Sequence, residues 1–217
     1  MPFAITLKVE EKLGVRCLDF HMAHDKTLSN CCKNNLVLNV KIPAIYVNIS
    51  WKMKVTFRKV REGDLKRLNE IINDVEANRF LNTAAPVSMK STRDFFNSLR
   101  KDERSWYAVL ADGVVVGGII LNLHGDKTKR SSHVASIGIN LAREYWGMGV
   151  GDKAIKFLTG LARKHKVKRF ELQYIEGNER ARRLYEKNGF KKEGVRKKAF
   201  KLNGRYYDSI VMAKFLK

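Results

Sequence analysis

The most regular feature of the chain is an alternation of apolar and polar positions within its first sixty residues. From Ile45 to Phe57 every second residue is apolar, and Tyr46 and polar side chains occupy the positions between. A period of two places alternate side chains on opposite faces, so this stretch predicts one long, half-buried β-strand. Residues 17–35 have no sustained period, and the pattern predicts no particular element there.

Two helical patterns follow this strand. Between Glu62 and Phe80 apolar residues recur at helical spacing, and Asp64 is suited to cap the first turn. The inward face of this helix would consist of Leu65, Leu68, Ile71, Ile72 and Val75. After a loop at 82–91, residues Thr92–Asp102 predict a shorter helix. Its inward side chains would be Phe95, Phe96 and Leu99.

Turn signals divide the rest of the chain into strands. Asp112-Gly113 and Asn203-Gly204 are two-residue hairpin signals, each between runs with strand character. The predicted strands are 105–111, 114–123, 132–141, 168–175, 190–200 and 205–215. Helices are predicted at 152–164 and 178–187. Elements in this order predict a mixed α/β sheet with helices on both faces.

A glycine-rich turn separates the strand that ends at Leu141 from the helix that follows. Gly147, Gly149 and Gly151 alternate in this turn. The first N–H groups of a helix lack internal partners and carry partial positive charge, and glycines let the backbone close around phosphate oxygens. The spacing matches neither a P-loop nor a dinucleotide fingerprint. The turn therefore predicts an anion site of another kind, with a ligand-free glycine turn as the alternative.

The charge balance is a second indication of an anionic partner. The chain has 43 Lys and Arg against 22 Asp and Glu, a formal net charge of +21. Residues 161–217 hold 18 basic and 6 acidic side chains, so 12 of the 21 excess positive charges lie in the last quarter. Such an excess favours polyanions such as RNA or the ribosome. The alternative is that these side chains only solvate the surface.

Composition also excludes several classes of protein. No apolar run approaches the roughly 18 residues that span a bilayer, and the first ten residues lack the features of a signal peptide. We therefore expect a cytoplasmic protein without membrane association. The three cysteines, Cys17, Cys31 and Cys32, fit neither a disulfide framework nor a zinc site. We expect reduced thiols and no bound metal.

The segment Phe170–Phe190 has the form of a strand followed by a short helix. Asn178 is suited to the N-cap of this helix, and Asn188-Gly189 is a C-cap signal. Together with the glycine turn, this segment resembles the GCN5-related N-acetyltransferase family, and is most similar to its members that acetylate ribosomal-protein N-termini. The resemblance covers residues 53–217. It implies the acyl-CoA N-acyltransferase fold, with a mostly antiparallel central sheet, and acetyl-CoA as the acetyl donor. Residues 1–52 are then an N-terminal extension that packs on the sheet edge or on a second subunit.

The resemblance also implies the residues that bind acetyl-CoA. The N–H groups of the glycine turn would hold the diphosphate, and the end of the preceding strand would bond the pantetheine arm through its main chain. Asn178 would contact the same arm or serve only as an N-cap. The family usually has Gln or Arg where Trp146 stands, so Trp146 would pack on the cofactor or in the core. The residues expected to bind the cofactor are Ile139, Asn140, Leu141, Gly147, Met148, Gly149, Val150, Gly151, Asp152 and Asn178.

Acetyl transfer needs a neutral amine and a proton donor for the departing thiolate. By resemblance, Tyr185 is this donor, and a phenol with a pKa of roughly 10 stays protonated at neutral pH. A purely structural Tyr185 is the alternative. Gln173 stands where related enzymes often have a glutamate, and it cannot accept a proton. Glu171, two residues earlier on the same strand face, is the expected catalytic base. Glu144, His133, a water chain or an already neutral α-amine remain open.

Three functions fit these observations. The first is acetylation of a primary amine by direct attack in a ternary complex, with the α-amine of a protein N-terminus as the acceptor. The second is acetylation of a small amine such as a polyamine or an amino sugar. The third is a non-catalytic RNA- or ribosome-binding protein on the same fold, which the residues at 146 and 173 favour. The expected partners are an amine substrate, RNA or the ribosome, and a second copy of the chain.

Overall fold

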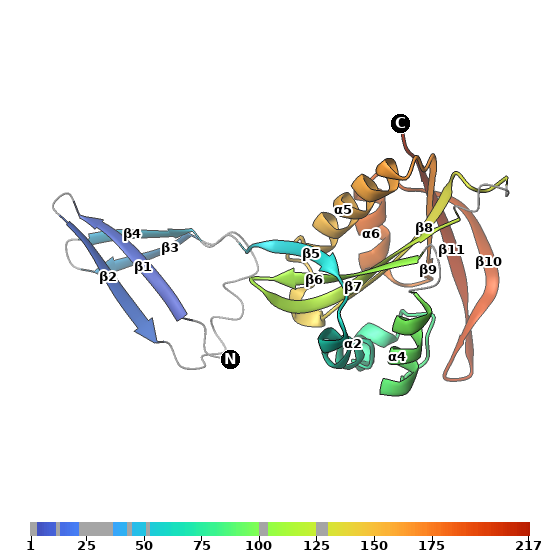
Figure 1. The fold of residues 1–217 in the computed structure, drawn as a ribbon, viewed down its shortest axis with the longest axis horizontal. Helices are drawn as coiled ribbons and strands as arrows, with labels where there is room; N and C mark the ends of the chain where they lie inside the picture. The colour runs from blue at the N-terminus through green and yellow to red at the C-terminus, as the bar shows by residue number, and fades with distance from the viewer. Residues whose placement is uncertain are drawn as a thin grey trace. The chain divides into compact units, whose positions relative to one another are not determined.

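The computed structural model describes two parts of the chain to different depths. For residues 4–11, 14–21, 37–42 and 45–50 it describes the backbone, and for residues 53–99, 104–124 and 130–217 it also describes the side chains. The chain divides into two compact units, Met1–Met53 and Lys54–Lys217 (Figure 1).

The first unit contains two antiparallel hairpins. In one, β1 (Ala4–Glu11) pairs with β2 (Gly14–His21). In the other, β3 (Val37–Ile42) pairs with β4 (Ile45–Ser50). The cysteine side chains, and the expected packing of this unit on a sheet edge or a second subunit, lie outside what the structure describes.

The prediction of one long strand from Ile45 to Phe57 is wrong. β4 ends at Ser50, and β5 (Val55–Lys59) belongs to the sheet of the second unit. Two short strands in different sheets produce the same period of two as one long strand. The pattern reports which face each side chain takes, and it does not report where one strand ends and the next begins.

The second unit is built on a seven-stranded sheet in the order β10-β11-β9-β8-β7-β6-β5. All neighbours are antiparallel except β8 and β9, which are parallel. The strands after β5 are β6 (Arg104–Ala111), β7 (Val114–Leu123), β8 (Val134–Leu141), β9 (Arg169–Ile175), β10 (Lys191–Leu202) and β11 (Arg205–Phe215). In Figure 1, α5 (Val150–Lys164) and α6 (Glu179–Lys187) lie on one face, and α2 (Leu65–Ile72) and α4 (Met89–Ser98) lie on the other. The predicted mixed, mostly antiparallel sheet with helices on both faces is confirmed.

The single helix predicted over 62–80 is instead broken at Asn73 and Asp74. The pieces are η1 (Glu62–Asp64), α2 and α3 (Val75–Asn78). Asp74 caps α3, because its carboxylate accepts the N–H of Ala77 at 2.9 Å and so competes with a continuous helix. The break turns Val75 outward, where it is 81% exposed. The prediction that Val75 faces the core is therefore wrong.

The next helix, α4, begins three residues before the predicted Thr92. Ser88 caps it, because its Oγ accepts a main-chain N–H of the first turn at 3.0 Å. Phe96 and Leu99 are buried, as predicted, and Phe95 is half-buried. None of the helices in the described part of the chain has the length and apolarity to cross a membrane.

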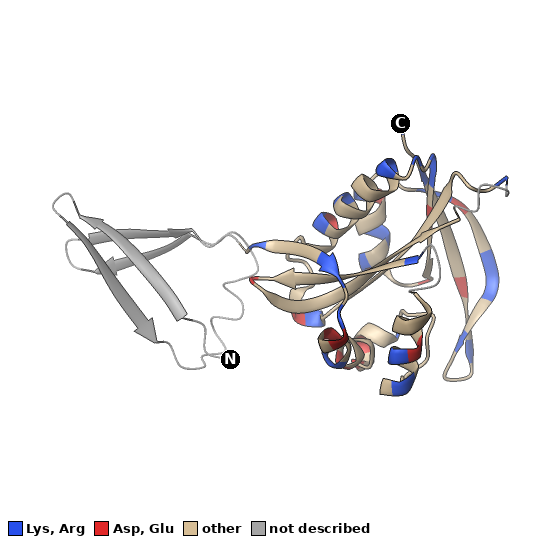
Figure 2. Cartoon of the chain, viewed as in Figure 1, with Lys and Arg blue, Asp and Glu red and all other residues tan. Residues whose placement is uncertain are grey.

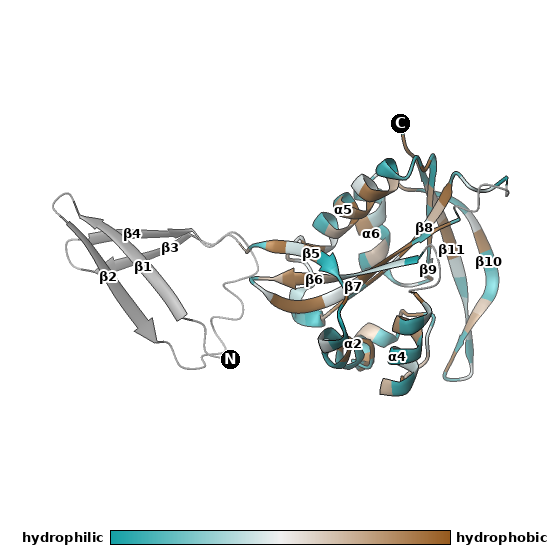
Figure 3. Ribbon diagram, viewed as in Figure 1, coloured by the Kyte–Doolittle hydropathy of each residue, from teal (hydrophilic) through white to brown (hydrophobic). Residues whose placement is uncertain are grey.

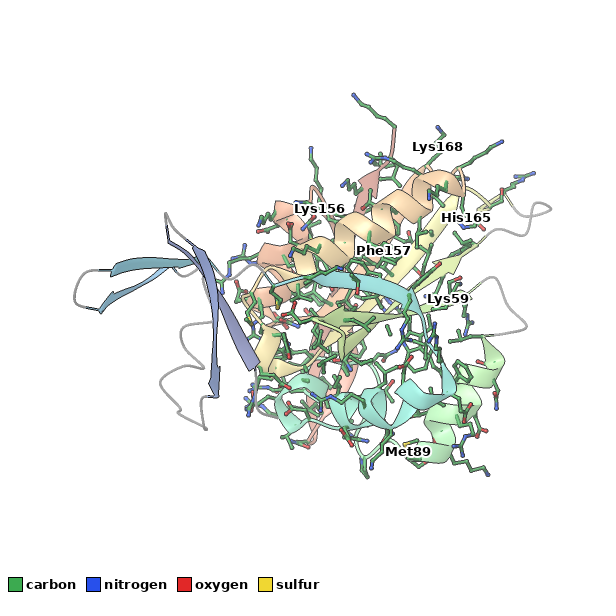
Figure 4. The ribbon with its side chains drawn as sticks, turned by 60° about the vertical axis from the view of Figure 1, so that its left-hand side comes forward. Lys59, Met89, Lys156, Phe157, His165 and Lys168 are labelled. Atoms are coloured by element: carbon green, nitrogen blue, oxygen red, sulfur yellow. The ribbon has the colours of Figure 1, made fainter. Side chains whose placement is uncertain are left out.

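The largest helix packs an apolar face on the sheet. Its fully buried side chains are Val150, Ala154, Ile155, Leu158 and Ala162. Phe157 stacks on Phe57 of β5 with ring centroids 4.4 Å apart. In Figure 4 Phe157 is directed toward the sheet, whereas Lys156 lies on the outer side of α5. Figure 3 shows apolar residues along the strands beneath the helix. This packing fixes α5, and with it the glycine turn at its start.

Candidate active site

The two parallel strands, β8 and β9, pair with each other only at their starts. β8 pairs with β7 from Ala135 to Leu141. Its ladder with β9 ends at the pair Ser136–Glu171. Beyond that pair, the edge of β8 that leads to the glycine turn is not bonded to β9. An unpaired strand edge presents N–H and C=O groups to which an extended ligand can bond.

The hydrogen bonds of β8 identify which peptide groups face this open edge. Ala142 N donates to Val116 O at 2.8 Å, so the even-numbered residues of β8 face β7. Successive residues direct their peptide groups to opposite edges of a strand. The peptide groups of Ile139 and Leu141 therefore face the open edge, whereas those of Asn140 face β7. Of the three residues expected to bond the pantetheine arm by main chain, Ile139 and Leu141 have the suitable orientation.

The glycine turn has a backbone conformation that suits glycine. Gly147 and Gly149 have φ angles of 78° and 77°, and a Cβ at either position would meet no atom within 4 Å. Gly149 is the N-cap of the 15-residue helix α5, whose first N–H groups have no helical partner. The space before the turn is thus open and adjoins N–H donors at the positive end of the helix dipole. These features fit a diphosphate such as that of coenzyme A.

Gly151 has a different role from the two glycines before it. A Cβ there would lie 2.9 Å from Leu184 Cδ2, so its absence lets α6 pack against the start of α5. Asp152 strengthens this junction, because its carboxylate accepts Asn188 Nδ2 at 3.1 Å and pairs with Lys156 at 2.8 Å. The bond to Lys156, and then that to Asn188, holds the pKa of Asp152 below its usual range. With its carboxylate engaged, Asp152 can contribute its main-chain N–H to an anion.

Trp146 and Arg180 form a pair that the sequence reasoning missed. Trp146 Nε1 donates to Leu141 O at 2.8 Å, which closes the turn between the strand and the glycines. The guanidinium of Arg180 lies 3.7 Å from the centre of the indole, a cation–π contact. Burial, and then repulsion by Arg183, lowers the pKa of Arg180. Although Trp146 is uncharged, it holds a cation beside the turn. The only signal in the sequence was the position of Arg180 in the first turn of a predicted helix.

Asn178 caps α6, as predicted from the sequence. Its Oδ1 accepts the N–H of Ala181 at 3.0 Å. The cap uses the oxygen of the side chain, so the Nδ2 group can still donate to another partner. The structural role and the expected contact with the cofactor arm are therefore compatible.

Tyr185 lies on the buried face of α6. It is 9% exposed, and its ring centroid is 6.0 Å from that of Tyr174 and 6.0 Å from that of Phe190. Burial, with a smaller contribution from Tyr174, raises the pKa of Tyr185 to about 12. Tyr174 belongs to the part of β9 that does not pair with β8. Tyr185 is therefore a protonated phenol next to the unpaired region of the sheet.

The carboxylates expected to act as a base are engaged in ion pairs. Glu171 lies at the last position where β9 pairs with β8. Its Oε2 accepts Arg169 Nε at 3.1 Å. Glu144 pairs with Arg67 at 2.9 Å. His133 is exposed and precedes β8, at the strand end opposite the glycine turn. Arg169 therefore engages one carboxylate oxygen of Glu171, Oε2, and the other oxygen can accept a proton from an amine.

Comparison with known proteins places this chain in one class, the GNAT acetyltransferases. A family model described as acetyltransferase (GNAT) domain matches residues 54–191, more than half of the chain. The chain belongs to the GNAT acetyltransferase family.

Relatives in sequence carry names from this class. The L-amino acid N-acetyltransferase AaaT of Escherichia coli is 33% identical over 104 residues, which are 48% of this chain and 63% of that protein. The chain thus matches slightly less than two thirds of that relative. A Bacillus subtilis protein named "Putative ribosomal N-acetyltransferase YdaF" is 28% identical over 168 residues, 72% of this chain and 88% of that protein.

Solved structures share the fold at low sequence identity. The ribosomal-protein-alanine N-acetyltransferase of Brucella melitensis superposes with a TM-score of 0.64 at 24% identity, covering 74% of this chain and 99% of that one. The spermidine N-acetyltransferase of Vibrio cholerae, solved with CoA and spermine, has a TM-score of 0.67 at 21% identity, with 74% and 95% covered. This likeness establishes the fold and does not select an acceptor.

Proposed function

We propose that this chain transfers the acetyl group of acetyl-CoA to the α-amine of a protein N-terminus, by direct attack in a ternary complex. The observation that carries the proposal is the early end of the β8–β9 ladder at Ser136–Glu171, on the edge that leads to α5. An open strand edge, a glycine-lined helix start and the buried Tyr185 adjoin this region. Bound acetyl-CoA would supply the activated acetyl group.

Each part of the cofactor has a counterpart in the chain. The main-chain N–H groups of residues 147–152 bond the diphosphate. The peptide groups of Ile139 and the N–H of Leu141 bond the pantetheine arm, because the carbonyl of Leu141 already accepts Trp146 Nε1. Asn178 donates to the same arm from its Nδ2. Arg180, held on Trp146 at 3.7 Å, adds positive charge near the diphosphate. Binding of acetyl-CoA therefore depends mostly on main-chain groups. The position of these groups does not change when side chains differ between members of a family.

Tyr185 donates a hydrogen bond to the sulfur of the departing coenzyme A. A phenol with a pKa of about 12 is a weaker acid than a thiol at about 8.5. Complete transfer of its proton alone would be unfavourable by about 5 kcal/mol. Tyr185 therefore stabilises negative charge on the sulfur as a donor. It gives up its proton only as a proton released by the amine replaces it.

The engaged carboxylates favour an α-amine as the acceptor. An α-amine has a pKa of about 8, so about a tenth of it is neutral at pH 7, whereas an amine with a pKa near 10.4 is almost fully protonated. Glu171 is the proposed base for the protonated fraction, and one of its two carboxylate oxygens is engaged by Arg169 at 3.1 Å. A site with a restrained base is better suited to an amine that needs little deprotonation.

The names of relatives and the charge of the chain point the same way. YdaF and the Brucella protein are named for ribosomal acetylation, and AaaT is named for L-amino acids, whose reactive group is also an α-amine. The net charge of +21 repels a polycation such as spermidine. An α-amine of a peptide therefore fits better than a polyamine.

The test is release of the coenzyme A thiol from acetyl-CoA with three acceptors at equal concentration. These are a peptide with a free N-terminus, the same peptide with a blocked N-terminus and one lysine, and spermidine. We expect the free N-terminus alone to accelerate thiol release, with one acetyl group on the α-amine by mass spectrometry.

Two other results would distinguish an error in the acceptor from an error in the reaction. Thiol release with spermidine or the blocked peptide alone would reject the α-amine and keep acetyl transfer. Absence of thiol release with every acceptor, together with no rise in melting temperature on addition of acetyl-CoA, would reject acetyl transfer and favour a binding function.

A further inference from the structure

A cavity lies along α5, beyond the glycine turn. It has a volume of about 480 Å³ and opens between α5, the end of α6 and β11. Its lining includes Lys156, Thr159, Arg163, Lys187, Asn188 and Lys214. Four of these six side chains are cations, so the cavity is suited to an anion.

Thr159 forms part of the wall of this cavity and has an unmet bonding requirement. It is 5% exposed, and its Oγ1 is buried without a hydrogen-bond partner among the described residues. A buried hydroxyl normally has a partner, because an unsatisfied one costs about 1–3 kcal/mol. An oxyanion in the cavity would give this hydroxyl an acceptor.

The cations of the cavity are only partly compensated. Lys156 and Lys187 share the carboxylate of Asp152, at 2.8 and 3.9 Å. In the described part of the chain, Arg163 and Lys214 form no ion pair with a carboxylate, and Lys214 Nζ donates to the main-chain carbonyl of Asn188 at 2.8 Å. Burial, and then repulsion by Arg163, lowers the pKa of Lys214. An anion between these two cations would remove the repulsion.

The lining indicates which anion fits. Among the described residues that line the cavity, none is aromatic or large and apolar, so nothing there would stack on a nucleobase. Figure 2 shows Lys and Arg repeated along α5 and along β10. Charge repeated along a surface suits the repeated phosphates of a nucleic acid. We propose that this cavity binds one phosphate of an RNA backbone, with nearby basic residues contacting the adjacent phosphates.

The Thr159 and Arg163 part of the cavity lies away from the proposed cofactor site, whereas Lys156 and Lys187 adjoin that site through Asp152. Thr159 lies ten residues beyond Gly149 on the same helix, a distance of about 15 Å along the helix axis. A diphosphate bonded at the start of α5 does not reach that far. The two proposals therefore make independent predictions, and each can fail alone.

The experiment measures binding of a short, fluorescently labelled single-stranded RNA to the full chain by anisotropy, over a series of salt concentrations, both without coenzyme A and with saturating coenzyme A. Arg163→Gln should weaken binding about fivefold and lower the salt slope by about one, because one phosphate contact is lost. Thr159→Val, which keeps the side-chain shape, should weaken binding about threefold through the lost hydrogen bond. Lys90→Gln, on the exposed face of α4, is the charge-matched control and should leave the affinity nearly unchanged.

Four results of this experiment would decide whether the cavity binds RNA. Equal losses in Arg163→Gln and Lys90→Gln would show only nonspecific attraction and overturn the proposal. Unchanged affinity in Thr159→Val would also overturn it. Displacement of the RNA by coenzyme A, or by inorganic phosphate at the same concentration, would give the cavity to those ligands instead. Acetylation of a short peptide by the three variants, at the wild-type rate, would show that the folded enzyme is intact while RNA binding is lost.

Discussion

At the scale of single residues, surroundings decide what the side chains near the β8–β9 gap can do. Tyr185 is buried between Tyr174 and Phe190, and its pKa rises to about 12 as a result. Glu171 has the right chemistry for a base, but Arg169 holds its carboxylate. The phenol is thus kept protonated as a donor, and the carboxylate is restrained as an acceptor.

We expect Tyr185→Phe to lower kcat about 100-fold with little change in the Kd for acetyl-CoA. Phenylalanine keeps the ring contacts and removes only the donor, and an acid catalyst typically contributes at least this factor. Steady-state thiol release measures kcat, and calorimetric titration measures the Kd. An unchanged kcat would mean that the hydroxyl takes no part in the reaction.

The pH dependence follows from the direction of the shift. The rate should rise through the pKa of the α-amine, near 8, as the amine becomes neutral. It should then stay level to about pH 10, because the raised pKa of about 12 keeps Tyr185 protonated there. A fall in rate below pH 10 would point to a different acid.

In the same series, Glu171→Gln should reduce the rate mainly below pH 8, where the amine needs a base. A uniform reduction would indicate a structural role through Arg169.

At the scale of elements, the glycine turn and α5 depend on each other. The buried face of α5 holds the helix on the sheet, and Gly151 lets α6 pack against its first turn. Gly149, at the N-cap, takes a positive φ that other residues adopt only with strain. The position of the helix start, where the diphosphate is expected, therefore depends on the core and on one backbone conformation.

We expect Gly149→Ala to lower the free energy of unfolding by about 1–2 kcal/mol and to weaken acetyl-CoA binding, because φ of 77° strains an alanine. Gly160→Ala is the control within the same helix. That glycine has open space for a Cβ, and alanine there should raise the free energy of unfolding by up to about 1 kcal/mol. Urea unfolding and cofactor titration measure both effects. Weakened binding in Gly160→Ala would show that the turn conformation is not the cause.

Element boundaries show where pattern reasoning succeeds and fails. The hairpins at Asp112-Gly113 and Asn203-Gly204 were predicted correctly, because all four residues have positive φ and local residue type decides such turns. The helix over 62–80 was predicted too long, because Asp74 caps a new helix. Apolar spacing cannot distinguish one helix from two in such a case.

At the scale of the whole molecule, the chain forms two compact units, and the second unit has a hydrophobic core. All its buried apolar residues with described side chains fall between Val60 and Leu216, and the chain divides at Met53. The family model likewise matches within this unit, from residue 54. The part of the chain that matches the family model thus has the features of a domain that folds independently.

We expect a fragment of residues 54–217 to unfold cooperatively and to bind acetyl-CoA with about the affinity of the full chain, because the core and the proposed cofactor site both lie within it. Calorimetry with and without acetyl-CoA measures both properties. A fragment that fails to fold would give the first unit a structural role, and a folded fragment that fails to bind would give it a role in the site.

The sequence by itself determined the family, the class of sheet, the glycine turn and the N-cap at Asn178. These depend on short spacings and on backbone preferences that a few neighbouring residues fix. Only the tertiary structure decided that Glu171 is held by Arg169, that Trp146 carries Arg180, and that the Thr159 hydroxyl is buried without a partner. Such features depend on how elements pack, because burial and charge partners come from residues that can lie far apart along the chain.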